Sequence, residues 1–230
     1  MTRGIILLFF LCLTNSVLGD SNKGVKLYES GKIKEAEVQL LADARNSLKK
    51  KDLVRIWHSY TQLAWYYHMI SDYRKGVGFS LIALRNARLL KDKFKIGKSL
   101  NFVGWSYSQI GRYKLAEEFF KKAIYLSSYI DKDTGKEVVS IPMVWGLASQ
   151  ELGHLYIKIG KVFEGEKFLL KTFKLSKKLD ILQGISESGA YLARLELLKG
   201  NLGKAVQRQL LFHFNDNYNY PRKISKMMPY

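Results

Sequence analysis

The chain has 230 residues, of which 47% are hydrophobic, and it carries a formal net charge of +18. This hydrophobic content excludes an intrinsically disordered chain, and only 3 prolines favour long helices over a loop-rich fold. The positive charge indicates anionic partners, such as phosphate-rich polymers, acidic glycans, anionic membranes or acidic proteins, without choosing among them.

Residues 1–19 have the features of a cleaved signal peptide. Arg3 precedes an apolar run, 5–13, that is shorter than the roughly 20 residues needed to span a bilayer. Val17 and Gly19 are small residues where a signal peptidase cleaves. We therefore expect cleavage after Gly19 and a secreted or periplasmic mature chain, with an uncleaved anchor as the alternative. No second apolar run of membrane-spanning length follows in the sequence.

The sequence contains no recognisable catalytic or cofactor motif. Its only cysteine, Cys12, lies within the expected signal peptide, so the mature chain would have no thiol chemistry and no disulfide. The four histidines, His58, His68, His154 and His213, do not show a metal-ligand spacing. P-loop, dinucleotide-binding and hydrolase motifs are missing from the sequence. We expect a protein that is not an enzyme and that uses neither a metal ion nor a cofactor.

Similar segments recur along residues 20–214. Residues 64–73, 104–113 and 153–162 read alike, and two weaker copies lie near the ends of this region. The expected turn residues of the five copies are separated by 40, 40, 49 and 40 positions: Gly31, Ser71, Gly111, Gly160 and Gly200. Five copies in nearly constant register predict a helical repeat protein.

The third copy shows the physical basis of the pattern. Its apolar spacing predicts a first helix over 99–110 and a second over 113–127. Gly104 has no side chain, so the second helix can approach closely, and Phe120 on that helix would fill the remaining space. Gly111 would end the first helix, because a left-handed terminal residue is least costly as glycine.

These residues resemble the tetratricopeptide repeat family over roughly residues 22–212. The resemblance implies an all-α fold, a right-handed α-solenoid of about five helix-turn-helix repeats, in which first helices line a concave groove and second helices form the outer wall. The spacing of 40 residues, against about 34 in the family, is similar to that of a longer-helix subclass whose members often act as cargo adaptors or peptide-sensing regulators. Some positions depart from the family pattern: Ser80 and Gln209 replace a large apolar residue, and Asp43 and Thr172 replace alanine.

The wider fourth interval places an insertion at about 128–144. Residues 131–137 read as an exposed turn, and 138–141 as a short extended piece before Pro142. The C-terminal tail, 215–230, either caps the last repeat or is not part of the fold.

The resemblance also predicts which side chains face the groove. One column holds Trp65, Trp105, His154 and Arg194, and neighbouring positions hold Gln62, His68, Asn101, Phe102, Gln109, Gln150 and Lys158. Aromatic and amide side chains suit a peptide or protein segment, although the two tryptophans could instead belong to the core. The clamp of lysines and asparagines with which the family grips a terminal carboxylate is missing at the equivalent positions.

Lysines gather on the expected outer wall. Lys167, Lys171, Lys174 and Lys178 follow the spacing i, i+4, i+7 and i+11 of one helix face and form a basic outer stripe. A solvated face is the ordinary interpretation of such a stripe, and binding to an anionic polymer or membrane surface is the alternative. Nucleic acid is disfavoured, because export separates the chain from it and no recognition motif is present.

These features predict an exported tetratricopeptide-type module that binds a peptide or protein segment in its concave groove, as an adaptor or assembly factor. One alternative is a ligand- or peptide-sensing regulatory component of a signalling system. Another is a binder of polyanions or cell-surface polymers through the basic outer face.

Overall fold

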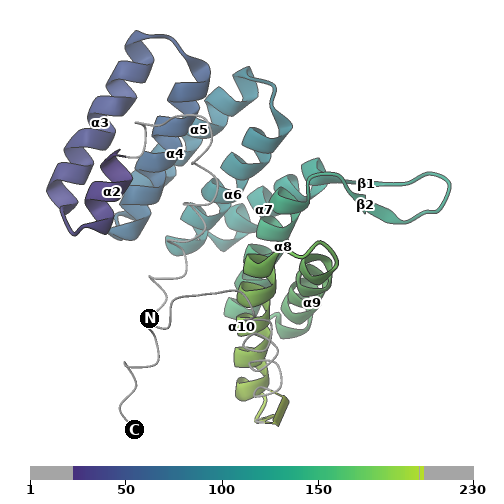
Figure 1. Cartoon of the computed structure of the whole chain (residues 1–230). Helices are drawn as coiled ribbons and strands as arrows, with labels where there is room; N and C mark the ends of the chain where they lie inside the picture. The colour runs from purple at the N-terminus through teal and green to yellow at the C-terminus, as the bar shows by residue number, and fades with distance from the viewer. Residues whose placement is uncertain (1–22, 202, 205–230) are drawn as a thin grey trace, which may run out of the picture. The chain divides into compact units, whose positions relative to one another are not determined.

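The computed structural model describes residues 23–201 and 203–204. In this part of the chain the helices are α2 (Lys23–Glu29), α3 (Ile33–Lys49), α4 (Leu53–Met69), α5 (Tyr73–Leu89), α6 (Lys93–Gln109), α7 (Tyr113–Ser127), α8 (Pro142–Lys158), α9 (Val162–Lys178) and α10 (Leu182–Leu198). Two short strands, β1 (Ser128–Ile130) and β2 (Glu137–Val139), separate α7 from α8 (Figure 1). The predicted all-α fold is confirmed. None of the described helices has the length and apolar character that crossing a bilayer requires.

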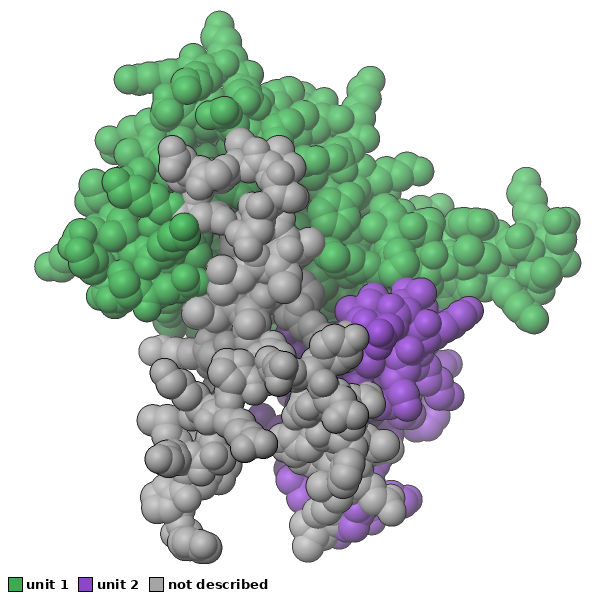
Figure 2. All heavy atoms as spheres, in the orientation of Figure 1, with its two compact units in different colours: residues 1–155 green, residues 156–230 purple. Residues whose placement is uncertain are grey.

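The chain divides into two compact units, residues 1–155 and 156–230, and the division falls within α8 (Figure 2). In the first unit each helix packs on the next, from α2 through to α7. In the second unit α9 packs on α10. Contacts between consecutive helices are the defining feature of an α-solenoid. The expected signal peptide, the tail 215–230, Gln209 and His213 lie outside the described residues.

Residues with positive φ end the helices at regular intervals. They are Gly31, Lys51, Ser71, Lys91, Gly111, Gly160, Asp180 and Gly200. Successive members are 20 residues apart except across the insertion, so one helix and its turn always occupy the same length. At Gly111, the backbone N–H donates to the carbonyl of Ser108, and the N–H of Arg112 donates to that of Tyr107. This pair of bonds is a Schellman motif, which satisfies the last carbonyls of α6.

Aspartates begin three consecutive helices. Asp52, Asp72 and Asp92 precede α4, α5 and α6, and each side chain accepts a hydrogen bond from backbone N–H groups of the first turn. Such N-caps stabilise a helix by about 1 kcal/mol each. Because Asp92 caps α6, this helix begins at Lys93, six residues before the start predicted from apolar spacing alone. The predicted bounds of the following helix, 113–127, are those of α7.

The insertion forms an antiparallel hairpin of β1 and β2, in which Tyr129 lies opposite Val138. It replaces the short turn found between other helix pairs, and it projects from the end of α7 (Figure 1). The indole Nε1–H of Trp145 on α8 donates to the Glu137 carboxylate at 3.1 Å, which ties the base of the hairpin to the helix that follows.

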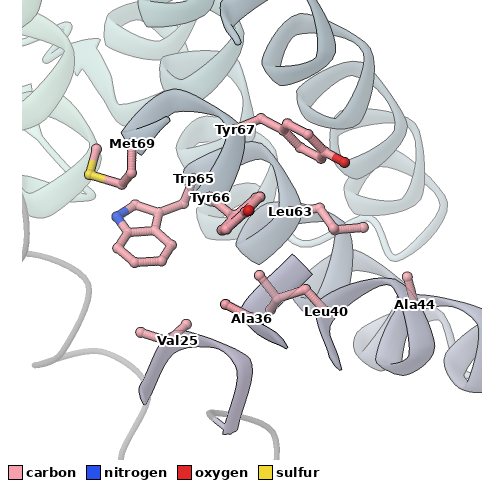
Figure 3. Close-up of a cluster of buried hydrophobic side chains, with 9 residues drawn as sticks. All are labelled: Val25, Ala36, Leu40, Ala44, Leu63, Trp65, Tyr66, Tyr67 and Met69. Atoms are coloured by element: carbon pink, nitrogen blue, oxygen red, sulfur yellow. The ribbon is translucent and has the colours of Figure 1, made fainter. Parts of the chain in front are cut away.

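A core cluster joins α2, α3 and α4 (Figure 3). Its members are Val25, Ala36, Leu40, Ala44, Leu63, Trp65, Tyr66, Tyr67 and Met69. Trp65 is only 1% exposed, and the ring of Tyr28 meets its indole edge-on with centroids 5.1 Å apart. Of the two roles that the sequence left open for Trp65, the structure shows the core role and contradicts an open groove position.

A second cluster joins α5, α6, α7 and α8 through Leu84, Leu100, Val103, Ala123, Val144 and Ala148. Glycines on α6 allow its neighbours to approach. A β-carbon at Gly104 would lie 2.7 Å from Cε1 of Phe120 on α7, and one at Gly97 would collide with the side chain of Val144 on α8. The predicted close approach at Gly104 is confirmed.

Candidate functional site

The predicted groove residues separate into three groups by exposure. Gln62, Trp65, His68, Asn101 and Gln150 are buried, Phe102, Trp105, Gln109 and His154 are half-buried, and Lys158 and Arg194 are exposed. The buried group lies within helix packing, so the expectation of an open floor made of all these side chains is wrong. Lys158 and Arg194 belong to the second compact unit, whereas the other nine belong to the first.

The half-buried side chains of α6 form a row. Phe102, Trp105 and Gln109 follow the spacing i, i+3 and i+7, which places them on one helix face. The rings of Phe102 and Trp105 meet edge-on, with centroids 6.4 Å apart, and both pack against the core cluster that contains Trp65. The row therefore borders α4 and keeps part of its aromatic surface open to a ligand.

A buried polar cluster lies beneath Trp105. The imidazole of His68 on α4 faces the Trp105 indole, with ring centroids 3.9 Å apart. Its Nε2 lies 2.7 Å from the hydroxyl oxygen of Ser106, and that hydroxyl donates its single proton to the carbonyl of Phe102. While the Ser106 hydroxyl donates to Phe102, its oxygen can accept from His68, a contact that requires the ring tautomer with its proton on Nε2.

Ser80 and Gly76 on α5 lie beside this cluster. Ser80 stands where the repeat usually has a large apolar residue, and its hydroxyl oxygen lies 3.2 Å from that of Ser106 and donates to the carbonyl of Gly76. A β-carbon at Gly76 would lie 3.1 Å from Nε2 of His68. One repeat later the sizes are reversed, with Phe120 at the position of Ser80 and Ser108 at that of His68. In the second copy the larger side chain is therefore on the first helix, α4, and in the third copy it is on the second helix, α7.

Burial controls the ionisation of this cluster. It lowers the pKa of His68 to about 3, so the ring is neutral at neutral pH. Within the described part of the chain, Nδ1 of His68 and Oδ1 of Asn101 are buried without a hydrogen-bond partner, which is uncommon in folded proteins. No cluster of three or more metal-ligating side chains occurs among these residues.

Basic side chains lie at the amino-terminal ends of α4 and α6. The ammonium groups of Lys95 and Lys98 lie 5.4 and 5.7 Å from a ring centroid of Trp57. Burial lowers the pKa of Lys98 to about 8, and burial together with the charge of Lys98 lowers the pKa of His58 to about 4. Sequence reasoning missed Lys98, although its position seven residues before Trp105 places it on the same face of α6.

The basic outer stripe lies on α9 in the second unit. Lys167, Lys171, Lys174 and Lys178 are all exposed. The buried residues of α9 lie on its opposite face: Gly165, Leu169, Thr172 and Ser176. Thr172, which departs from the alanine of the repeat, donates its hydroxyl to the carbonyl of Phe168, so its polar group is satisfied.

The tetratricopeptide repeat family model matches residues 97–129, which span most of α6 and all of α7. Residues 97–129 therefore match a tetratricopeptide repeat. Its matched repeat contains the Gly104–Phe120 contact and the row of half-buried side chains. The comparison with curated proteins found no match.

Solved structures share the tetratricopeptide repeat fold at low sequence identity. BtubC from P. vanneervenii is 16% identical over 90% of this chain and 84% of its own, with a TM-score of 0.61. A signal transduction ATPase from Pyrococcus horikoshii with a tetratricopeptide repeat sensor is 19% identical over 87% of this chain and 30% of its own, with a TM-score of 0.67. A Podosopora anserina protein with nearly identical TPR-like repeats is 16% identical over 84% of this chain and 91% of its own, with a TM-score of 0.61.

Proposed function

We propose that this tetratricopeptide repeat protein binds a peptide or protein segment along the face shared by α4 and α6, as an adaptor or assembly factor. The row of Phe102, Trp105 and Gln109 carries the proposal, because its aromatic rings are rigidly packed yet half open. Rigid aromatic side chains contribute large contact area at small entropic cost and are frequent hot spots of binding. The proposal assigns the chain a binding role and no catalytic one.

A polar group at the end of the row suits the backbone of an extended segment. Gln109 closes the carboxyl-terminal end of the row with a half-buried amide that can both donate and accept. This amide would help to set the register of the segment, while the aromatic rings supply most of the affinity.

We predict that Phe102→Ala and Trp105→Ala each weaken the binding of a selected peptide by at least tenfold, as hot-spot truncations do. Peptides would be selected from a random library on chain 20–230, and their affinities measured by calorimetry. Tyr125→Ala is the matched control, since this aromatic residue on α7 is 86% exposed and lies outside the row. Circular dichroism would check that each variant keeps its helices. Unchanged affinity in Trp105→Ala would contradict the proposed face.

A sensing role is the second candidate. It is supported by the Pyrococcus horikoshii protein, whose repeats are described as a sensor. A sensor must change state when its ligand binds, so peptide binding would alter amide hydrogen exchange in helices remote from α4 and α6. In an adaptor, peptide binding would slow amide hydrogen exchange only in α4 and α6.

We also propose that the chain is exported and cleaved after Gly19, a site outside the described residues. The support is the short apolar run with Val17 and Gly19 at the positions read by signal peptidases. Mass spectrometry of the chain made in an exporting host should show Asp20 as the first residue. A Val17→Arg and Gly19→Arg variant should keep residues 1–19. A wild-type chain that retains Met1 and stays in the cytosol would contradict export.

A further inference from the structure

The helix α9 has two opposite faces of different character. Its buried residues, Gly165, Leu169, Thr172 and Ser176, lie on one side, and within the second unit α9 packs on α10. At about 100° per residue, the directions opposite to this side hold seven consecutive positions of the helical wheel. These are Phe163, Lys167, Leu170, Lys171, Lys174, Lys177 and Lys178. Five lysines therefore share about one third of the helix circumference.

Acidic side chains are kept to the margins of this arc. Glu164 and Glu166 stand at its two borders on the helical wheel. Glu166 is paired with Lys199 on the segment after α10, their charged atoms being 2.6 Å apart. No acidic residue stands among the seven positions of the arc, so the arc carries a net positive charge. A second copy of the same face is thereby disfavoured as its partner, because the two would repel each other.

An exposed aromatic ring accompanies the lysines. Phe163, at the first turn of α9, is 78% exposed and lies on the same arc as Lys167 and Lys174. A polyanion dissolved in water offers no apolar phase to receive such a ring. The headgroup region of a bilayer does offer one, and helices that lie on membranes combine lysines with aromatic side chains in this way.

We infer that the face formed by Phe163, Lys167, Lys171, Lys174 and Lys178 docks on an anionic lipid bilayer. The lysines lie over the headgroup phosphates, and Phe163 enters the boundary between headgroups and acyl chains. This site is separate from the α4–α6 face, and it does not rest on the proposed peptide binding. It commits the basic stripe to a lipid surface rather than to a soluble polymer.

The test is sedimentation of chain 20–230, which retains every described residue, with vesicles of phosphatidylcholine alone or mixed with phosphatidylglycerol. We expect binding to the mixed vesicles only, and we expect it to weaken as salt is added. Each lysine near an anionic surface contributes about fivefold to the partition coefficient. The triple variant Lys167→Gln, Lys174→Gln and Lys178→Gln should therefore bind roughly 100-fold more weakly, and Phe163→Ser about tenfold more weakly.

A matched variant tests whether vesicle binding depends on where the positive charge lies or only on the net charge of the chain. Lys114→Gln, Lys121→Gln and Lys122→Gln remove the same charge from α7, where Lys121 and Lys122 pair with Glu117 and Glu118. Binding by this variant should stay close to that of the wild type. An equal loss in both triple variants would overturn the inference, since net charge alone would then decide.

Two further outcomes would also overturn it. The first is a full vesicle affinity in Phe163→Ser, combined with equally tight binding of polyphosphate, which would point to a soluble polyanion. The second is that the wild-type chain does not bind the mixed vesicles, although its circular dichroism shows that it is helical. Trp105→Ala should keep its vesicle affinity, so a failure of the lipid site and a failure of the peptide site are distinguishable.

Discussion

Phe120→Ala is expected to lower the free energy of unfolding of the first unit by about 3–5 kcal/mol. The ring is fully buried at the crossing of α6 and α7, directly against Gly104. Removing it leaves a cavity that two helices fixed by their turns cannot readily close. Denaturant unfolding followed by far-ultraviolet circular dichroism would measure the loss.

Gly104→Ala tests the same contact from the opposite helix. The added β-carbon would lie 2.7 Å from Phe120 Cε1, and overpacking of this kind costs about 1–3 kcal/mol. Combining it with Phe120→Leu should relieve the collision, so the pair should cost less than the sum of the single changes. Strictly additive costs would contradict the contact.

Gly78→Ala is the matched control for that experiment. Gly78 is also a glycine within a helix, but a β-carbon there meets no atom within 4 Å. The change should therefore stabilise the first unit by about 0.5–1 kcal/mol, because alanine loses less conformational entropy in a helix.

Acidification from pH 7 to pH 5 is expected to destabilise the first unit through His68. Burial lowers the pKa of His68 to about 3 in the folded chain, against about 6.5 in the unfolded chain. Between these values the unfolded chain binds a proton that the folded chain does not, so stability falls as the pH falls. The loss is about 1.4 kcal/mol per pH unit below 6.5, or about 2 kcal/mol by pH 5.

His58 also lowers the stability of the first unit as the pH falls from 7 to 5, whereas Lys98 does not contribute to this loss. Burial and the charge of Lys98 lower the pKa of His58 to about 4, so this ring also opposes protonation in the same window. Lys98, with a pKa lowered to about 8, is charged in both states between pH 7 and pH 5.

The pH dependence of the unfolding free energy should be shallower in His68→Gln than in the wild type. The slope, rather than the stability at pH 7, is the informative quantity, because the substitution also changes packing. His58→Gln should flatten the slope independently, and the double variant should be flatter still. If His68→Gln kept the full acid sensitivity, the ring would have to titrate normally in the folded chain.

The fold could be predicted well where local chemistry repeats. Gly111 and its counterparts identify helix ends because only glycine adopts a left-handed backbone without steric cost, and the bounds of α7 follow from that turn. The start of α6 was missed because apolar spacing weakens near its first turns. The pairs Lys51–Asp52 and Lys91–Asp92 stand 40 residues apart and are a second signal in the same register, since each combines a turn residue with an N-cap.

The candidate site could be predicted only in part. Trp65 and Trp105 occupy equivalent positions, and the sequence period assigns both to the same helix face. They differ in exposure. Trp65 is 1% exposed and packs edge-on against Tyr28 of α2, whereas Trp105 is half-buried and packs on His68, the counterpart of Tyr28 40 residues later. Ser80 signals an exception to the repeat, but the Ser106 hydroxyl that it shares with His68 lies on another helix, and periodicity does not predict this contact.

The indole N–H signals of the four tryptophans test the binding proposal most directly. Trp57 and Trp145 donate to Ser99 and Glu137, and Trp65 is buried. In ¹H–¹⁵N spectra, with the Trp105 signal assigned from Trp105→Phe, we predict that a selected peptide shifts this signal more than the other three. Saturating peptide that leaves the Trp105 signal in place would show that the α4–α6 face is not the binding site.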